Sequence, residues 1–202
     1  MAKFPRPRPY FKTYVDPVVR MIILSDIFFW SAWYTVLPLL SVFAIQEIPG
    51  ATIETATFGF SIYLVSRVIA SMLGSVFSAK TTDGRRVFIL IYSILVLNLA
   101  YILMAFTRSI VTFYIFYIII GLGFGLANPI RSALFSMHLD KHKEAMEWAV
   151  LDSLILLGIA ACALIGGMVI KQYGFTVLFL LATIFNFMSI FPYLLYKHRY
   201  KI

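Results

Sequence analysis

Six long apolar runs, each bounded by charged or turn-forming residues, constrain this chain more than any other feature of its sequence. They cover approximately residues 18–45, 56–79, 87–106, 110–134, 148–170 and 175–196. A helix needs about 20 apolar residues to cross the ~30 Å hydrocarbon core of a membrane. A helix is favoured there because it satisfies all of its own backbone hydrogen bonds where water is absent. The sequence therefore predicts an all-α membrane protein, a single domain over residues 1–202 with six transmembrane helices.

Composition excludes several other classes of protein. With 61% hydrophobic and 13% charged residues, the chain is too apolar for a water-soluble domain and for a disordered one. Its single cysteine, Cys162, excludes an internal disulfide and a cysteine metal site. The sequence has no phosphate loop, metal-ligand cluster or pairing of nucleophile and base. We therefore expect no enzyme activity, no metal and no cofactor.

The placement of basic residues predicts the orientation of the helices. The net charge is +8, from 17 Lys and Arg against 9 Asp and Glu. Most cations lie in the N-terminal segment, the second-to-third and fourth-to-fifth connections, and the tail, whereas the opposite side carries only Arg108 and Lys171. The positive-inside rule then makes both termini cytoplasmic. We expect an integral protein of a prokaryotic plasma membrane, in contact with lipid and not with nucleic acid.

The connection between the second and third runs carries the most specific motif. Its residues, over positions 74–86, are Gly-Ser-Val-Phe-Ser-Ala-Lys-Thr-Thr-Asp-Gly-Arg-Arg. This segment resembles the signature loop of the major facilitator superfamily of secondary transporters, in which a Gly is followed by an Asp four residues on and then by Gly-Arg-Arg. Ser78 stands where that family has its Asp, and two extra residues precede Gly84. Asp83 is the candidate for the missing carboxylate.

Glycines and prolines extend this resemblance over essentially the whole chain. Residues 121–129, with three glycines before Asn-Pro, resemble the glycine-rich fourth helix of the family. Residues 158–167 resemble its fifth helix, without the proline of the antiporter motif. Two prolines and two glycines, at 38 and 129 and at 84 and 174, recur at offsets of 91 and 90 residues. The resemblance implies half of a twelve-helix transporter, built as a 3+3 inverted repeat.

The resemblance also implies a conformational latch at the cytoplasmic face. Its candidate residues are Asp83, Gly84, Arg85, Arg86, Arg131 and Asp152. Asp152 is expected to pair with Arg131 or with the Arg85-Arg86 loop. The alternatives need no latch, because Asp-Gly is a common turn, Arg-Arg follows from the positive-inside rule, and acids suit the first turn of a helix.

Asp26, within the first run, is the leading candidate for a functional group, because a carboxylate at this depth in a membrane is costly. Helical spacing places Asp26, Trp30 and Trp33 on one face, which is expected to line a substrate cavity. Arg67, within the second run, lies at a similar depth and is the predicted ion-pair partner of Asp26. The alternatives are a structural salt bridge and tryptophans that serve packing or interfacial anchoring.

Two stripes of polar and small residues are further candidates for cavity walls. The stripe on the second run comprises Tyr63, Arg67, Ser71, Gly74 and Ser78. The stripe on the fourth run comprises Tyr114, Tyr117, Gly121, Gly125, Asn128 and Ser132. Their hydroxyl and amide groups could orient a polar solute, or their small residues could serve helix packing. Asn98 and Asn186, each alone in an apolar run, are expected to form structural hydrogen bonds.

Taken with the resemblance, these residues predict a secondary transporter that moves a small solute by alternating access, with Asp26 as a proton-coupling residue. Six helices form only one side of the family's cavity, so we expect a parallel homodimer around a twofold axis. Two alternatives stay open: a non-transporting membrane scaffold with a degenerate transporter fold, and one half of a longer or two-gene transporter. The identity of the substrate has no signature in the sequence.

Overall fold

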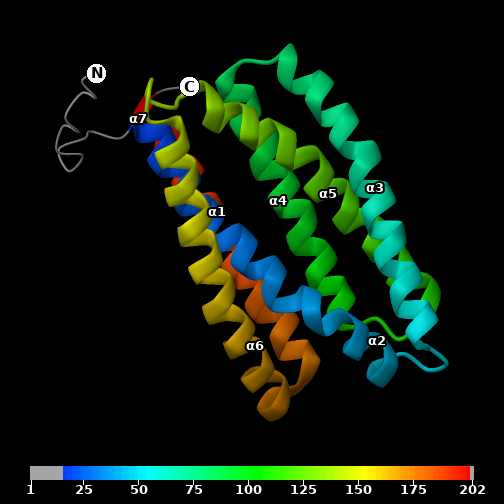
Figure 1. The fold of residues 1–202 in the computed structure, drawn as a ribbon. Helices are drawn as coiled ribbons and strands as arrows, with labels where there is room; N and C mark the ends of the chain where they lie inside the picture. Colours follow the sequence, from blue (N-terminus) through cyan, green and yellow to red (C-terminus); the bar gives the residue numbers. More distant parts are fainter. Residues whose placement is uncertain (1–15, 201–202) are drawn as a thin grey trace, which may run out of the picture.

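A computed structural model describes residues 16–200, and within them the chain is helical and has no strand. The elements are α1 (Pro17–Val36), the 3-10 helix η1 (Leu37–Leu39), α2 (Leu40–Glu47), α3 (Ile53–Ala79), α4 (Asp83–Ala105), α5 (Ile110–Met137), α6 (Glu144–Met188) and α7 (Ile190–Tyr200). In the bundle, α1 packs mainly on α6, and α3 packs mainly on α5 (Figure 1). The predicted all-α class is confirmed for the described residues. The basic residues before residue 16 and after residue 200, which helped to predict the orientation, lie outside them.

Five stretches are long and apolar enough to cross a membrane. They are Pro17–Glu47, Ile53–Ala79, Asp83–Ala105, Ile110–Met137 and Glu144–Leu195. Large apolar side chains cover much of the outer surface, and on α3 alone Val65 and Val68 are each 60% exposed and Met72 is 69% exposed. Such an apolar exterior is unfavourable in water and suits contact with lipid. These features support an integral membrane protein.

The first predicted run is interrupted at Pro38. Asp16 caps the start of α1, since its Oδ1 accepts a hydrogen bond from the Val18 amide at 2.7 Å, and Pro17 follows at the first helical position. α1 ends at Val36, and residues 37–39 form η1. Proline has no N–H to donate and its ring crowds the preceding turn, so one continuous α-helix over residues 18–45 is not formed.

Two helical segments of α6 meet at Gly174. The backbone there has φ 79° and ψ −179°, which residues with a Cβ atom rarely adopt. The chain reverses its direction at Gly174, within α6, and the second segment runs back along the bundle (Figure 1). The predicted boundary between residues 170 and 175 contains this break. α6 begins at Glu144, four residues before the predicted start, and Ser189 separates it from α7.

Glycines bring the backbones of α3 and α5 into close contact. A Cβ atom on Gly121 would lie 2.5 Å from the carbonyl oxygen of Tyr63, and one on Gly74 would lie 2.9 Å from a carbonyl oxygen of α5. A Cβ atom on Gly125 would meet the carbonyl oxygen of Arg67. The glycines of the two predicted stripes therefore serve helix packing, which was the alternative to a cavity wall, whereas Ser132 of the same α5 stripe lines the cavity.

A buried amide pair joins α4 to the second segment of α6. Nδ2 of Asn186 donates to Oδ1 of Asn98 at 2.9 Å and to the carbonyl oxygen of Ile94 at 3.4 Å. The two asparagines are 1% and 5% exposed, respectively. Their predicted structural hydrogen bonding is confirmed.

Candidate functional site

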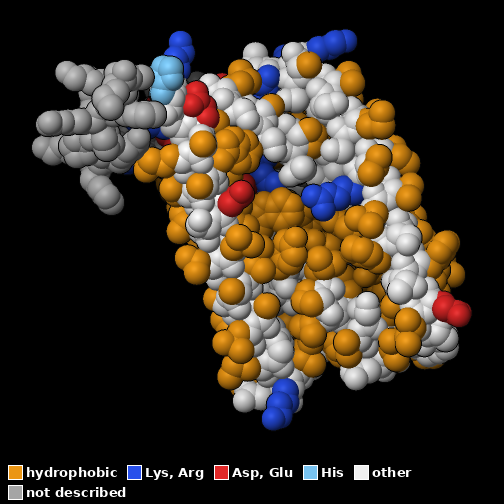
Figure 2. Space-filling view, viewed as in Figure 1, with side chains coloured by type: hydrophobic (Ala, Val, Ile, Leu, Met, Phe, Trp, Pro, Cys, Tyr) orange, Lys and Arg blue, Asp and Glu red, His pale blue; other side chains and the backbone are white. Residues whose placement is uncertain are grey.

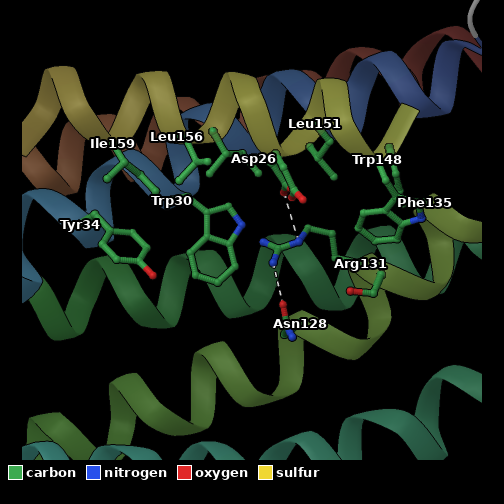
Figure 3. Close-up of a pocket in the computed structure, with 13 residues that line it drawn as sticks. Asp26, Trp30, Tyr34, Asn128, Arg131, Phe135, Trp148, Leu151, Leu156 and Ile159 are labelled. Carbon is green, nitrogen blue, oxygen red and sulfur yellow. Dashed lines mark hydrogen bonds and ion pairs between the residues drawn. The ribbon is translucent and has the colours of Figure 1, made fainter. Parts of the chain in front are cut away.

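A cavity of about 390 Å³ lies between α1, α5 and α6 (Figure 3). Its lining includes Asp26, Trp30 and Tyr34 of α1, Asn128 and Arg131 of α5, and one mostly apolar face of α6 over residues 148–159. Figure 2 shows acidic and basic side chains beside an apolar hollow in the middle of one face of the molecule. Mostly apolar cavities of this size with a few charged groups are typical of small-molecule sites.

Asp26 and Arg131 form a buried ion pair on the cavity wall. Oδ1 of Asp26 lies 3.2 Å from Nε of Arg131, and the side chains are 4% and 6% exposed. The contact is an ion pair and not an aligned hydrogen bond, because this Oδ1 accepts no hydrogen bond of normal geometry. Nη2 of Arg131 donates to Oδ1 of Asn128 at 2.8 Å. The guanidinium carbon also lies 4.8 Å and 4.9 Å from the ring centroids of Phe29 and Trp30, which adds cation–π attraction.

Arg67, the predicted partner of Asp26, forms no ion pair with it. Nη1 of Arg67 instead donates to the hydroxyl of Tyr63 at 2.8 Å. The predicted pairing of Asp26 with Arg67 is wrong because residue counting fixes the depth of a side chain in its helix but not which neighbouring helix it faces. The cation that reaches Asp26 comes from Arg131 on α5, which the sequence assigned to the latch.

The predicted aromatic face of α1 lines the cavity only in part. Trp30 is on the wall, but Trp33 is 1% exposed and packs in the core, with its ring centroid 5.0 Å from that of Tyr63 and 4.9 Å from that of Phe124. Tyr34 lines the cavity instead. Positions three and four residues after Trp30 are both compatible with one helical face, so spacing alone did not separate Trp33 from Tyr34.

The tyrosines of the two predicted stripes lie away from the cavity. Tyr63 and Tyr117 are each 1% exposed, and their ring centroids are 6.3 Å apart in the core between α3 and α5. Tyr114 packs against Phe58, with ring centroids 5.4 Å apart. None of the three lines the cavity, whereas Asn128, from the same stripe of α5, does.

Sequence reasoning missed the wall that α6 contributes. Its apolar members Trp148, Leu151, Ile155 and Ile159 recur at intervals of three and four residues, and this helical periodicity was the signal that could have identified them.

Asp152 lies on the α6 wall and is exposed to the cavity. Among the residues that the structure describes, it forms no ion pair, so the predicted pairing with Arg131 or with the Arg85-Arg86 loop is absent. Arg131 pairs with Asp26 instead.

The model of one family, the Major Facilitator Superfamily, matches residues 22–201. The chain belongs to that superfamily. One similar solved structure is the POT family transporter PepTSo, with 17% sequence identity and a TM-score of 0.81; the match covers 93% of this chain and 38% of that one. Another is an auto-inhibited POT family peptide transporter, with 16% identity and a TM-score of 0.76; the match covers 91% of this chain and 38% of that one. These likenesses show a shared fold, and the chain spans about 38% of the length of each structure. No curated protein matches it.

The signature loop of this Major Facilitator Superfamily chain forms a polar cluster at the ends of α3, α4 and α5. Nη1 of Arg86 lies 2.6 Å from Oδ1 of Asp83, and its Nη2 donates to the carbonyl oxygen of Ser78 at 2.8 Å. Nε2 of His138 lies 3.6 Å from Oδ2 of Asp83. Asp83 thus supplies a carboxylate to a loop in which Ser78 has none, while Arg85 is exposed. Of the six predicted latch residues, Arg131 and Asp152 lie in the cavity instead.

Proposed function

We propose that this protein is a proton-coupled secondary transporter that moves a small solute by alternating access, as a parallel homodimer. Its family supports a membrane transporter of a small molecule. The observation that carries the proposal is the buried pair of Asp26 and Arg131 on the wall of a cavity of about 390 Å³. Charged groups inside membrane proteins are costly and commonly serve substrate or ion pathways.

Asp26 is the proposed proton carrier. While Arg131 is near, it supplies a countercharge to the carboxylate. A solute that draws Arg131 away, or a movement that separates α1 from α5, leaves an ionised carboxylate without a countercharge in a medium of low dielectric. Proton uptake by Asp26 removes that cost. Opening of the pair and proton binding are then linked, which allows a proton gradient to drive solute movement.

Six membrane crossings with cytoplasmic termini are part of the proposal. Glu144–Leu195 has 52 residues, whereas one crossing takes about 20. The reversal of the chain at Gly174 supports two crossings in this stretch, in addition to the four other spans. An even number of crossings puts both termini of the chain on the same side of the membrane, and the distribution of basic residues favours the cytoplasmic side. The proline and glycine offsets support the 3+3 inverted repeat, and we assign the protein to a prokaryotic plasma membrane.

The proposed homodimer follows from the size of the chain relative to the transporters that share its fold. The chain covers 38% of the length of each of those transporters, and in the proposal it forms one wall of a transport cavity. A second copy in the same orientation, related by a twofold axis along the membrane normal, would face the cavity of the first and close it. The cluster of Asp83 and Arg86 is the proposed cytoplasmic latch of each copy.

Uptake into proteoliposomes tests the transport proposal. A thermal-stabilisation screen over sugars, amino acids, organic ions and amphipathic drugs selects a solute, and the reconstituted chain should accumulate it when a proton gradient is imposed. A membrane scaffold, the alternative, would show neither stabilisation by a solute nor uptake. A chain that works only with a different second half would bind the solute without moving it.

A further inference from the structure

Arg67 carries a positive charge in the middle of a membrane-spanning helix, and no carboxylate of residues 16–200 forms an ion pair with it. Arg86, Arg108 and Arg131 each face an acid, at 2.6 Å, 3.5 Å and 3.2 Å. Arg67 forms no ion pair with any residue that the structure describes. It lies 12 residues from the C-terminal end of α3, or about 18 Å along the helix. An uncompensated guanidinium at this depth is costly unless an anion binds to it.

The position of Arg67 is fixed by the packing around it. Its amide nitrogen would lie 3.2 Å from a Cβ atom on Gly121, and its carbonyl oxygen meets the position of a Cβ atom on Gly125. Its Nη1 donates to the hydroxyl of Tyr63 at 2.8 Å, one turn earlier in α3. This single hydrogen bond leaves most of the guanidinium N–H donors available for a ligand. The group is therefore pre-organised before a ligand arrives, which lowers the entropic cost of binding.

Aromatic rings connect Arg67 to the cavity. Its guanidinium carbon lies 5.8 Å from the ring centroids of Trp30 and Phe124 and 5.9 Å from that of Tyr63. Trp30 also lines the cavity, and the Arg131 guanidinium lies 4.9 Å from the same ring. Arg131 is neutralised by Asp26, but the charge of Arg67 is not compensated. The ring of Trp30 therefore offers a flat apolar surface between two guanidinium groups, of which that of Arg67 has no ion pair with any described residue, while the carboxylate of Asp152 lies on the α6 wall of the same cavity.

We propose that Arg67 binds the carboxylate of a small organic anion whose apolar part packs against Trp30, so that the transported solute is an organic anion. The proposal rests on the proposed transport function and narrows it to a class of substrate. A guanidinium donates two parallel hydrogen bonds to a carboxylate, which gives orientation as well as affinity. Asp152, the acid of the α6 wall without an ion pair, opposes the same anion, so its removal should strengthen binding.

Three compounds with one skeleton and different charges test this site. The full chain is placed in discs of zwitterionic phosphatidylcholine, and tryptophan fluorescence is titrated with 3-phenylpropionate, 3-phenylpropanamide and 3-phenylpropylamine. The carboxylate should bind about tenfold or more tightly than the neutral amide, the factor that one charge-assisted hydrogen bond supplies, and the amine should bind most weakly. Equal affinities of carboxylate and amide, or no binding in the millimolar range, would overturn the proposal.

Variants test whether Arg67 causes the preference for the carboxylate over the amide. Arg67→Gln should lower the affinity for the carboxylate to that of the amide, Arg67→Lys should retain part of the preference, and Asp152→Asn should raise it. Arg108→Gln, in the connection between α4 and α5 and paired with Glu47, is the matched control and should change nothing. An unchanged carboxylate affinity in Arg67→Gln would overturn the site. If Arg67→Gln does not fold, the preference for carboxylate over amide in the unmodified chain and in Arg67→Lys decides.

Two further experiments show whether a lipid headgroup occupies the site and whether the anion site or the transport function is wrong. Displacement of 3-phenylpropionate by phosphatidylglycerol in the disc would assign Arg67 to a lipid headgroup and overturn the proposal. Uptake assays distinguish a failure of the anion site from a failure of the transport function. If the carboxylate binds in a way that depends on Arg67 but is not taken up, the proposed transport function is rejected and the anion site stands. Uptake of a neutral or cationic solute that is insensitive to Arg67→Gln rejects the anion site and keeps the transporter.

Discussion

The carboxylate of Asp26 on α1 meets Nε of Arg131 on α5 at 3.2 Å, with both side chains almost fully buried. α1 packs mainly on α6 and α5 mainly on α3, and the aromatic side chains of α1 also contact Phe124 of α5. The ion pair is a buried polar link between the helix pair α1–α6 and the helix pair α3–α5. Its imperfect alignment, with no normal hydrogen bond to Oδ1, means that less hydrogen-bond energy is lost when the pair opens.

Replacing Asp26 tests proton coupling. Asp26→Asn keeps the shape of the side chain but removes its titratable proton, so accumulation driven by a pH gradient should be lost while solute exchange continues. Proteoliposome uptake with and without an imposed gradient measures both. Glu54→Gln, in the exposed first turn of α3, is the matched control. Unchanged accumulation in Asp26→Asn would remove Asp26 from the coupling mechanism.

A double-mutant cycle tests which arginine neutralises Asp26. Asp26→Asn or Arg131→Gln alone leaves one buried charge unpaired and should cost about 3 to 5 kcal/mol of unfolding free energy. The double variant should cost clearly less than the sum, because no charge is left unpaired. Asp26→Asn combined with Arg67→Gln should instead be additive to within about 0.5 kcal/mol. Denaturation of the detergent-solubilised protein provides the values, and additivity for Asp26 with Arg131 would contradict the ion pair.

The helices and the family could be predicted from the sequence because they depend on local patterns. Apolar runs bounded by charges located the spans, and the residues around Gly84 indicated the superfamily. Contacts between helices could not be predicted in the same way. The depth of Asp26 was known, but the rotation of α3 and α5 that brings Arg131 and not Arg67 to it is set by glycine packing between those helices. Whether Trp33 or Tyr34 faces the cavity likewise depends on contacts between helices, which the sequence pattern does not show.

The glycine contact between α3 and α5 predicts that Gly121→Ala lowers the stability of the protein and that Gly167→Ala does not. Gly121→Ala would place a Cβ atom 2.5 Å from the carbonyl oxygen of Tyr63, and the helices would have to separate. Overpacking of this kind costs about 1 to 3 kcal/mol. Gly167→Ala on α6 meets nothing within 4 Å and should leave the stability essentially unchanged. Thermal unfolding in one detergent compares the two, and equal losses would show that α3 and α5 do not touch at Gly121.

The proposed homodimer predicts two subunits in each active unit. A twofold interface that must part on each side in turn should be partly polar and moderate in size, so the dimer is expected to dissociate readily in detergent. The measurement therefore belongs in lipid. Single-molecule subunit counting at low protein density should find pairs, with crosslinking yields independent of further dilution. Monomers that still transport would rule out the dimer.

The reversal of α6 at Gly174 also bears on how the chain is made. One residue with φ 79° joins the two segments, so no loop separates them in the folded chain. Lys171, close to the tip, is costly to carry through hydrocarbon on one apolar helix. We expect both segments to insert into the membrane together, as one unit. A nascent chain truncated soon after Gly174 should then leave its last apolar segment outside the bilayer and become a target for proteolysis.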